Sequence, residues 1–169
     1  MANMCDVYGS VIINTNTGDA LKIANCINKL TKNWHYTFDL EIDQEDMNQE
    51  DKHSIELRFN ASGRWSFQYN IELLGRWLAN TDDDDIGEAI EYLIEHDFEL
   101  LIDYQEIEMG FAFIGVGSGS VTHNIGTYLS ECKCENSDYT EYDLNVKNLV
   151  DILDFDEEYA KEYLKYTEE

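Results

Sequence analysis

A long stretch without positive charge is the feature that most restricts how this chain can fold. No lysine or arginine occurs between Arg76 and Lys133, although aspartate and glutamate are frequent there. The whole chain has 36 acidic and 11 basic residues, a net charge of -25 on 169 residues. The surface of the folded protein must therefore repel itself at neutral pH and low salt.

Selection usually removes such a cost, so its persistence suggests that the charge has a use. The negative charge can keep the protein in solution under extreme conditions, bind cations, or attract a basic partner that normally binds nucleic acid. Adaptation to high salt would spread the acids evenly, whereas the first 38 residues hold only Asp6 and Asp19.

The composition otherwise predicts a folded domain. Apolar residues make up 43% of the chain and aromatic residues 12%, whereas disordered acidic tails are poor in aromatics. The length fits one domain spanning 1–169. The N-terminus has no basic region followed by an apolar run, and no apolar run reaches roughly eighteen residues, so we expect no signal peptide and no membrane span. Four cysteines are few for a secreted scaffold, which favours a reducing cytoplasm.

Hydrophobic periodicity predicts an α+β fold with a mostly antiparallel sheet. Alternation predicts strands over 5–13, 36–42, 55–59, 65–69, 98–104, 111–116 and 121–129. Residues 65–69 are expected to be the hairpin partner of 55–59, and Gly115, Gly117 and Gly119 to form a glycine hairpin. Helical spacing predicts helices over 19–30, 71–78, 82–94, 144–153 and 157–166, with Asp19 as an N-cap. The core would then cover about 5–129, followed by a C-terminal helical extension over about 144–166.

The middle of the chain is similar to a known domain. Ile55-Glu56-Leu57-Arg58-Phe59 is followed by Trp65 and a helix, and Leu100–Glu106 is followed by Met109–Gly115. Over about residues 5–117 this arrangement resembles the YubB-type ferredoxin-like domain of plasmid and phage proteins. The resemblance implies a ferredoxin-like fold and a mobile genetic element in a bacterial host, and it brings no activity or catalytic residues. The family usually places Ser-Pro-Pro after its tryptophan, where this chain has Ser66, Phe67 and Gln68.

Two motifs resemble metal sites but lack part of the ligand set. Cys132 and Cys134 form a Cys-x-Cys pair, whereas zinc sites prefer Cys-x-x-Cys with a second matched pair. The run Asp82–Asp85 starts like a calcium loop, but Ile86 and Leu93 occupy positions that need oxygen ligands. We therefore expect no metal and no cofactor.

One arrangement resembles a nucleophilic catalytic site. Ser118 or Ser120 could pair with His123, but nothing in the sequence orients these side chains. A metal-dependent or other enzyme therefore ranks last among the hypotheses.

Several acidic residues recur at regular spacing. Alternate residues of a strand are about 6.6–6.8 Å apart, about twice the ~3.4 Å rise per charge along one strand of duplex DNA. Asp39, Glu41 and Asp43 have this spacing, as do Glu106 and Glu108, and Glu88, Glu91 and Glu95 form a comparable ladder on a helix. Any solvent-facing element of an acidic protein shows the same pattern, so nucleic-acid mimicry and simple solvation both stay open.

Our first hypothesis is a small non-enzymatic inhibitor from a phage or plasmid. It would bind a basic nucleic-acid-binding protein of the host, a restriction or CRISPR nuclease, and would bind neither nucleic acid nor membrane itself. The expected partner-binding residues are Asp82, Asp83, Asp84, Asp85, Glu88, Glu91, Glu95, Glu99, Asp103, Glu106, Glu108, Asp39, Glu41 and Asp43. The alternative is an accessory or assembly protein of a mobile element whose acidity only keeps it soluble.

Such an interface also needs apolar anchors, since buried groups hold a complex more than charges at its rim do. Tyr92, Tyr104, Tyr139 and Tyr142 are the expected exposed anchors.

Overall fold

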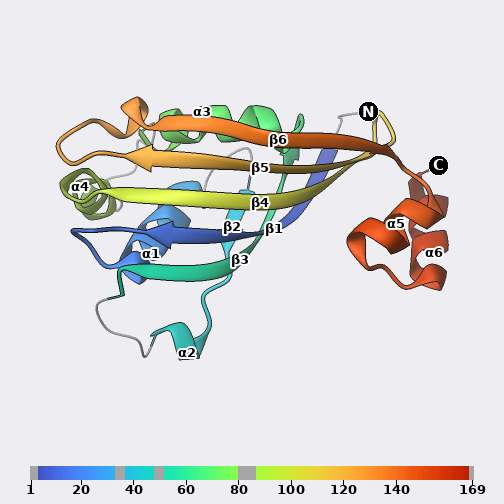
Figure 1. Cartoon of the computed structure of the whole chain (residues 1–169), viewed down its shortest axis with the longest axis horizontal. Helices are drawn as coiled ribbons and strands as arrows, with labels where there is room; N and C mark the ends of the chain where they lie inside the picture. Colours follow the sequence, from blue (N-terminus) through green and yellow to red (C-terminus); the bar gives the residue numbers. More distant parts are fainter. Residues whose placement is uncertain (1–3, 33–36, 48–51, 80–86, 168–169) are drawn as a thin grey trace.

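A six-stranded antiparallel sheet forms the centre of the protein in a computed structural model, which describes residues 4–32, 37–47, 52–79 and 87–167. The strands are β1 (Met4–Asn14), β2 (Thr37–Leu40), β3 (Ser54–Arg64), β4 (Phe98–Glu108), β5 (Phe113–His123) and β6 (Lys133–Asp143). Their order in the sheet is β2-β3-β1-β4-β5-β6, so β1 lies inside and β6 forms one edge (Figure 1). The α+β class with an antiparallel sheet is confirmed.

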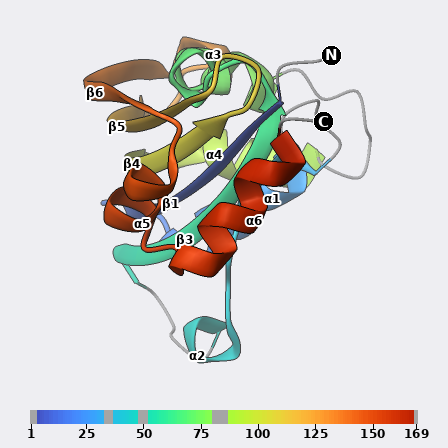
Figure 2. The ribbon, with the colours of Figure 1, turned by 90° about the vertical axis from the view of Figure 1, so that its right-hand side faces the viewer.

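The helices of the described residues are α1 (Ala20–Thr31), α2 (Gln44–Met47), α3 (Phe67–Ala79), α4 (Gly87–Glu95), α5 (Val146–Leu153) and α6 (Glu157–Thr167), with a short 3-10 helix η2 (Leu129–Glu131). Apart from α2 and η2, they form two groups. Helices α1, α3 and α4 cover one face of the sheet, whereas α5 and α6 lie together at one end of the molecule (Figure 1, Figure 2). No helix in the described part of the chain is long and apolar enough to cross a membrane.

The strands alternate between a covered face and an open face. In β1, Cys5, Val7, Val11 and Ile13 are buried, and they belong to the main core with the apolar sides of α1, α3 and α4. A second, smaller cluster forms where Ile107 and Ile114 of the sheet pack with Leu149 of α5 and Ala160 of α6. We call it the C-terminal cluster.

Two aspartates fix the start of α1. Asp19 is the N-cap that the sequence predicts, since its carboxylate accepts hydrogen bonds from the backbone N–H groups of Leu21 and Lys22. Asp97 holds the preceding loop by accepting from the backbone and side chains of Asn16 and Thr17. Burial alone would raise the pKa of Asp97, but these hydrogen bonds outweigh it and lower the pKa to about 2. Asp97 is thus a structural carboxylate.

The predicted hairpin between 55–59 and 65–69 is wrong. Strand β3 continues to Arg64 and pairs with β1 over its whole length. The chain turns at Trp65, whose φ of 74° lies in the left-handed region, and α3 then begins at Phe67. Phe67, Ile71, Leu74 and Leu78 are buried at helical spacing, and this longer period decides the structure of the segment.

The three glycines predicted to form a hairpin instead lie inside a strand. Strand β5 runs through Gly115, Gly117 and Gly119 and pairs with β4 and β6 on either side. A Cβ at Gly117 would lie 2.5 Å from the Tyr104 hydroxyl, and a Cβ at Gly115 would lie 2.6 Å from the Tyr139 hydroxyl. The glycines therefore make room for two tyrosines packed over the strand.

The sequence periodicity does not predict β6. It predicts a strand over 121–129, but β5 ends at His123 and is followed by η2 and then by β6. Most residues of β6 are exposed, because this strand forms the edge of the sheet, so it lacks a regular apolar pattern. The sheet consequently extends beyond residue 129, whereas the predicted C-terminal helices are confirmed as α5 and α6.

The packing between β1 and its neighbours yields a test. A Cβ at Gly9 would collide with the backbone oxygen of Asp103 and lie 2.6 Å from the Phe59 ring, whereas Gly87 has nothing within 4 Å. We expect Gly9→Ala to lower the free energy of unfolding by about 1–3 kcal/mol, the usual cost of overpacking. The control Gly87→Ala should keep or slightly raise stability, because alanine favours helix over glycine. Urea denaturation followed by circular dichroism measures both, and equal stabilities would contradict the packing.

Candidate protein-binding surface

Most acidic side chains lie at the surface without a basic neighbour. Among the described residues two ion pairs form, Lys133–Glu135 at 3.0 Å and Lys161–Glu157 at 2.5 Å, and both are solvent-exposed. β1, α4, β4 and β5 contain no lysine or arginine, and β6 contains Lys133 alone. The neighbouring strands β1, β4, β5 and β6 therefore carry one base between them, whereas β3 on the other side of β1 contains Arg58 and Arg64.

The edge strand β6 exposes more carboxylates than any other strand of the sheet. Glu135, Asp138, Glu141 and Asp143 are exposed on it, and the outer edge pairs with no described strand. Glu141 and Asp143 are two residues apart on a regular part of the strand, which separates them by about 6.6–6.8 Å. The sequence does not predict this surface, because β6 lacks a regular apolar pattern.

Helix α4 presents the acidic ladder that its sequence predicts. Glu88, Glu91 and Glu95 are all exposed on the side opposite the buried Ala89 and Leu93. Asp82, Asp83, Asp84 and Asp85 precede this helix and lie outside the described residues.

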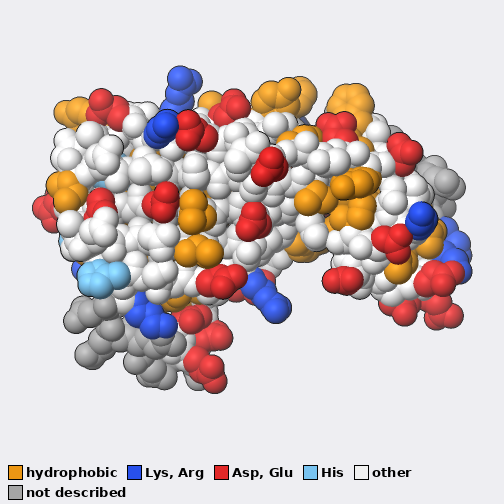
Figure 3. All heavy atoms as spheres, viewed as in Figure 1, with side chains coloured by type: hydrophobic (Ala, Val, Ile, Leu, Met, Phe, Trp, Pro, Cys, Tyr) orange, Lys and Arg blue, Asp and Glu red, His pale blue; other side chains and the backbone are white. Residues whose placement is uncertain are grey.

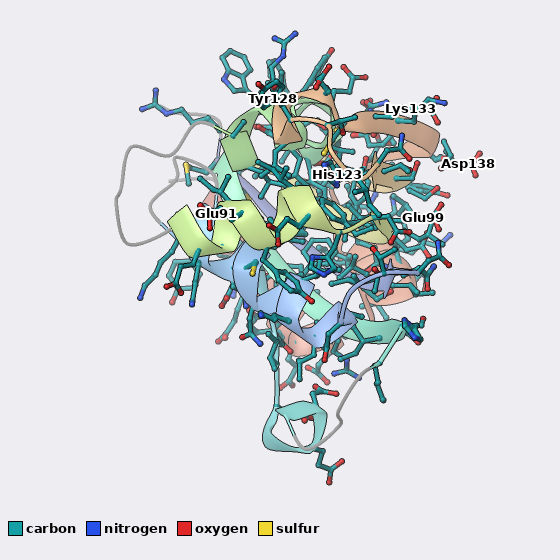
Figure 4. The ribbon with its side chains drawn as sticks, turned by 90° about the vertical axis from the view of Figure 1, so that its left-hand side faces the viewer. Glu91, Glu99, His123, Tyr128, Lys133 and Asp138 are labelled. Atoms are coloured by element: carbon teal, nitrogen blue, oxygen red, sulfur yellow. The ribbon has the colours of Figure 1, made fainter. Side chains whose placement is uncertain are left out.

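The acids of β4 divide between the two faces of the sheet. Glu99 and Asp103 lie on the open face, where acidic side chains are scattered among apolar ones (Figure 3). Glu91 of α4 lies on one side of the molecule, whereas Glu99 and Asp138 lie on the other (Figure 4). Neighbouring acids in the sequence from Glu88 to Glu108 thus do not form one continuous surface.

The predicted ladder of Asp39, Glu41 and Asp43 is not formed along one strand. Strand β2 ends at Leu40, and of the three residues Asp39 alone belongs to it. Glu41 accepts a hydrogen bond from Asn60 Nδ2 at 2.5 Å, and Asp43 accepts one from the backbone N–H of Asp46 at 2.9 Å. All three are exposed, but two of them have local partners.

Glu106 does not face solvent and cannot contact a partner. It is 0% exposed and accepts four hydrogen bonds on its two carboxylate oxygens. The donors are Cys5 Sγ at 3.1 Å, Ser66 Oγ at 2.7 Å, the Phe67 backbone N–H at 2.6 Å and the Tyr139 hydroxyl at 2.6 Å. Burial raises the pKa of Tyr139 well above its usual value, and the hydrogen bond to Glu106 raises it further, which keeps this hydroxyl a donor.

Glu108 is buried as well, at the end of the same strand. Its carboxylate accepts from the backbone N–H groups of Gly110 at 3.3 Å and Phe111 at 2.8 Å. Both glutamates have the same parity along β4 as the buried Phe98 and Leu100. This parity is the signal that could have excluded them, had the predicted strand been extended beyond Tyr104.

The predicted aromatic anchors are mostly inside the protein. Tyr104 is 3% exposed, Tyr92 and Tyr139 are partly buried against the core, and Tyr142 alone of the four is exposed. Tyr92 is held by the backbone N–H of Asp19, which donates to its hydroxyl, and by Lys22 over its ring. Large side chains that are well exposed lie elsewhere, among them Trp65, Tyr69, Phe111, Tyr128 and Tyr166.

The residues considered for nucleophilic catalysis do not come together. Ser118 and Ser120 lie on the open face of β5, whereas His123 is buried on the opposite face. The ring nitrogens of His123 lie 2.9 Å and 3.0 Å from the carbonyl oxygens of His96 and Thr127, so this histidine has a structural setting.

A shallow groove of about 520 Å³ lies on the open face and offers a different set of groups. Its polar lining includes Ser10, Arg58, Asp103 and Gln105. No histidine or cysteine is part of this lining.

The Cys132 and Cys134 thiols are partly buried. Burial raises the pKa of the Cys132 thiol to about 12, with the neighbouring Cys134 adding to the shift, and burial also raises the pKa of Cys134. Across the described residues no three His, Cys, Asp or Glu side chains are grouped to hold a metal ion.

Comparison with known proteins finds no relative: no family model, no curated protein and no solved structure matches the chain.

The hydrogen bonds of Glu106 can be tested by removing its charge without changing its shape. We expect Glu106→Gln to lower the free energy of unfolding by about 1–3 kcal/mol, because the amide group cannot accept all four donors. The matched control is Glu141→Gln on exposed β6, which should change stability by no more than about 0.5 kcal/mol. Urea unfolding at pH 7 measures both. A Glu106→Gln variant as stable as the parent would show that the carboxylate is not needed.

Proposed function

We propose that this protein is a non-enzymatic inhibitor that binds a basic nucleic-acid-binding protein of a bacterial host through its acidic surface. The observation that carries the proposal is the uncompensated charge on the neighbouring strands β1, β4, β5 and β6, where Lys133 is the one base. Exposed carboxylates at Glu135, Asp138, Glu141 and Asp143 line the adjacent edge. In a basic DNA-binding cleft they would take the places of phosphates and keep DNA out.

The strand order supports a ferredoxin-like core and hence the mobile-element setting. Taken from β4, the order is β4-β1-β3-β2, and the chain runs β1-α1-β2-β3-α3-β4 apart from short helices. This is the β-α-β-β-α-β succession of ferredoxin-like domains. We propose that β5, β6, α5 and α6 are additions to such a core, in a phage or plasmid protein that acts in the host cytoplasm.

Electrostatics would set the speed of binding. Exposed charges act over about 8 Å at physiological ionic strength, so they steer a partner toward the surface before contact. Charge at the rim of an interface changes mainly the association rate. Binding by this protein should therefore slow as salt is raised.

The second candidate is an accessory or assembly protein whose acidity only keeps it soluble. Charged residues on an edge strand prevent pairing with strands of other chains, and β6 has such an edge. Under this function the number of carboxylates would matter and their positions would not.

Inhibition of DNA cleavage tests the proposal. Purified restriction endonucleases and CRISPR effector nucleases are assayed with and without the protein. We expect at least one nuclease to be inhibited, and added duplex DNA to relieve the inhibition because both ligands compete for one basic cleft. No inhibition across the panel, or micromolar binding of the protein itself to duplex DNA, would argue for the second candidate.

The position of the charge separates the two candidates. We expect the triple variant Glu135→Gln, Asp138→Asn, Glu141→Gln to slow association with the inhibited nuclease by at least about threefold, or roughly 0.65 kcal/mol. The control Glu88→Gln, Glu91→Gln, Glu95→Gln removes the same charge from α4 and should have a smaller effect. Both variants should be as stable as the parent or slightly more so, because self-repulsion falls. Biolayer interferometry measures the rates, and equal slowing by both triples would mean that net charge alone matters.

A further inference from the structure

Neither the backbone conformation nor burial in the core explains why a tryptophan occupies position 65. Its φ is 74°, a conformation that glycine adopts freely and that a side chain with a Cβ makes unfavourable. Its side chain is 67% exposed, so burial does not account for it either. Strained backbone at a bulky residue points to function where the surrounding structure enforces it.

The surroundings of Trp65 do enforce its conformation. Asn70 Nδ2 donates to the carbonyl oxygens on both sides, to Arg64 at 3.4 Å and to Ser66 at 2.8 Å. The Ser66 hydroxyl and the Phe67 backbone N–H both donate to Glu106. Buried groups thus fix the residues before and after Trp65, while the indole ring itself stays in solvent.

Two exposed apolar residues of α3, four positions apart, follow the turn at Trp65. Tyr69 is 65% exposed and Leu73 is 38% exposed, and residues four apart are neighbours on a helix surface. Ile71 and Leu74 of the same helix are buried in the core. We call Tyr69 and Leu73 of α3, together with Trp65 at the turn that precedes the helix, the α3 stripe. Tryptophan and tyrosine are the side chains that most often carry the binding energy of protein interfaces.

The β6 side of the α3 stripe is acidic. Asn136 Nδ2 of β6 donates to the Gln68 carbonyl at 3.0 Å and to Glu72 Oε1 at 3.1 Å, which holds the edge strand against α3. Glu72 of α3 is exposed beside this contact, and Asp138 of β6 is exposed as well. The exposed bases nearest in the sequence, Arg64 and Arg76, flank the two ends of the stripe.

The net charge selects the kind of partner. At -25 per chain, a second copy of this protein would be repelled from the stripe. A basic protein surface is attracted to the same border of carboxylates. Charge complementarity therefore favours a basic protein over a homodimer.

We propose that the α3 stripe is the apolar anchor of the inhibitory complex and inserts into an apolar pocket within the basic surface of the partner. The inference rests on the proposed function. It adds the residues that hold the complex together after electrostatic attraction has brought the two proteins into contact. The carboxylates of β6 set the association rate, and the α3 stripe sets the dissociation rate.

Trp65→Gly tests the proposal because it separates binding from folding. Glycine accepts a φ of 74°, so the variant should melt at the same temperature as the parent or higher. Its complex with the nuclease most strongly inhibited in the panel should dissociate about tenfold faster or more, with an association rate within threefold of the parent. Tyr69→Ala should also speed dissociation. The matched control is Ala112→Gly, at a non-glycine φ of 55° in the β4–β5 turn, which should leave both rates unchanged.

Each result decides between distinct outcomes. If the nuclease binds and neither Trp65→Gly nor Tyr69→Ala changes its dissociation, the anchor is wrong while the proposed function stands. If no nuclease is inhibited, the proposed function and the proposed anchor are both wrong. A lower melting temperature for Trp65→Gly would assign tryptophan a structural role and overturn the proposal. Sedimentation completes the set: a dimer that Tyr69→Ala converts to monomer would make a second copy the occupant.

Discussion

The buried carboxylate of Glu106 joins parts of the chain that are distant in sequence. It lies on β4, and its four donors come from β1, from Ser66 just before α3, from Phe67 at the start of α3, and from β6. All four donors are neutral groups, so the site is stabilised by hydrogen bonds rather than by an ion pair. Several other features depend on it: Gly115 leaves space for the carboxylate, Tyr139 is drawn over β5, and α3 starts at a fixed place.

This arrangement also relates the interior to the surface. The turn at Trp65 has its geometry because Ser66 and Phe67 are bound to Glu106 and because Asn70 holds the carbonyl groups on either side. Glu106, which the sequence predicts to be exposed, is thus buried. Its hydrogen bonds to Ser66 and Phe67 fix the backbone next to the exposed Trp65. The proposed interface would owe its rigidity to a residue that touches no partner.

The success of sequence analysis depends on whether the signal is local. Asp19 with the apolar spacing of Leu21 to Leu30 identifies α1, and similar spacing identifies α5 and α6, because helix caps and helix faces are read within a few residues. Residues 65–69 fit a strand equally well, and the period over the next ten residues decides for helix. The glycines of β5 and the polar edge β6 could not be assigned, since their roles come from tyrosines and strands elsewhere in the chain.

The candidate site is harder to predict for the same reason. Glu88, Glu91 and Glu95 are exposed as expected, since an amphipathic helix shows its charged side directly. Glu106 and Glu108 lie on the same face of β4 as the buried Phe98 and Leu100. They are buried despite their charge, because neutral hydrogen-bond donors surround their carboxylates. Trp65 gives no sign in the sequence of its backbone conformation. This conformation is evident from the structure alone.

The C-terminal cluster has a consequence for how the molecule opens. Ile107 and Ile114 are the buried residues that the sheet contributes to it, and a hydrogen bond from Gln105 Nε2 to the Ile152 carbonyl at 2.9 Å adds a polar link. Local unfolding follows such small, separate contact groups. By this principle we expect α5 and α6 to open as a unit of their own while the main core stays closed. Such opening would leave the six-stranded sheet intact and expose the end of its open face to solvent.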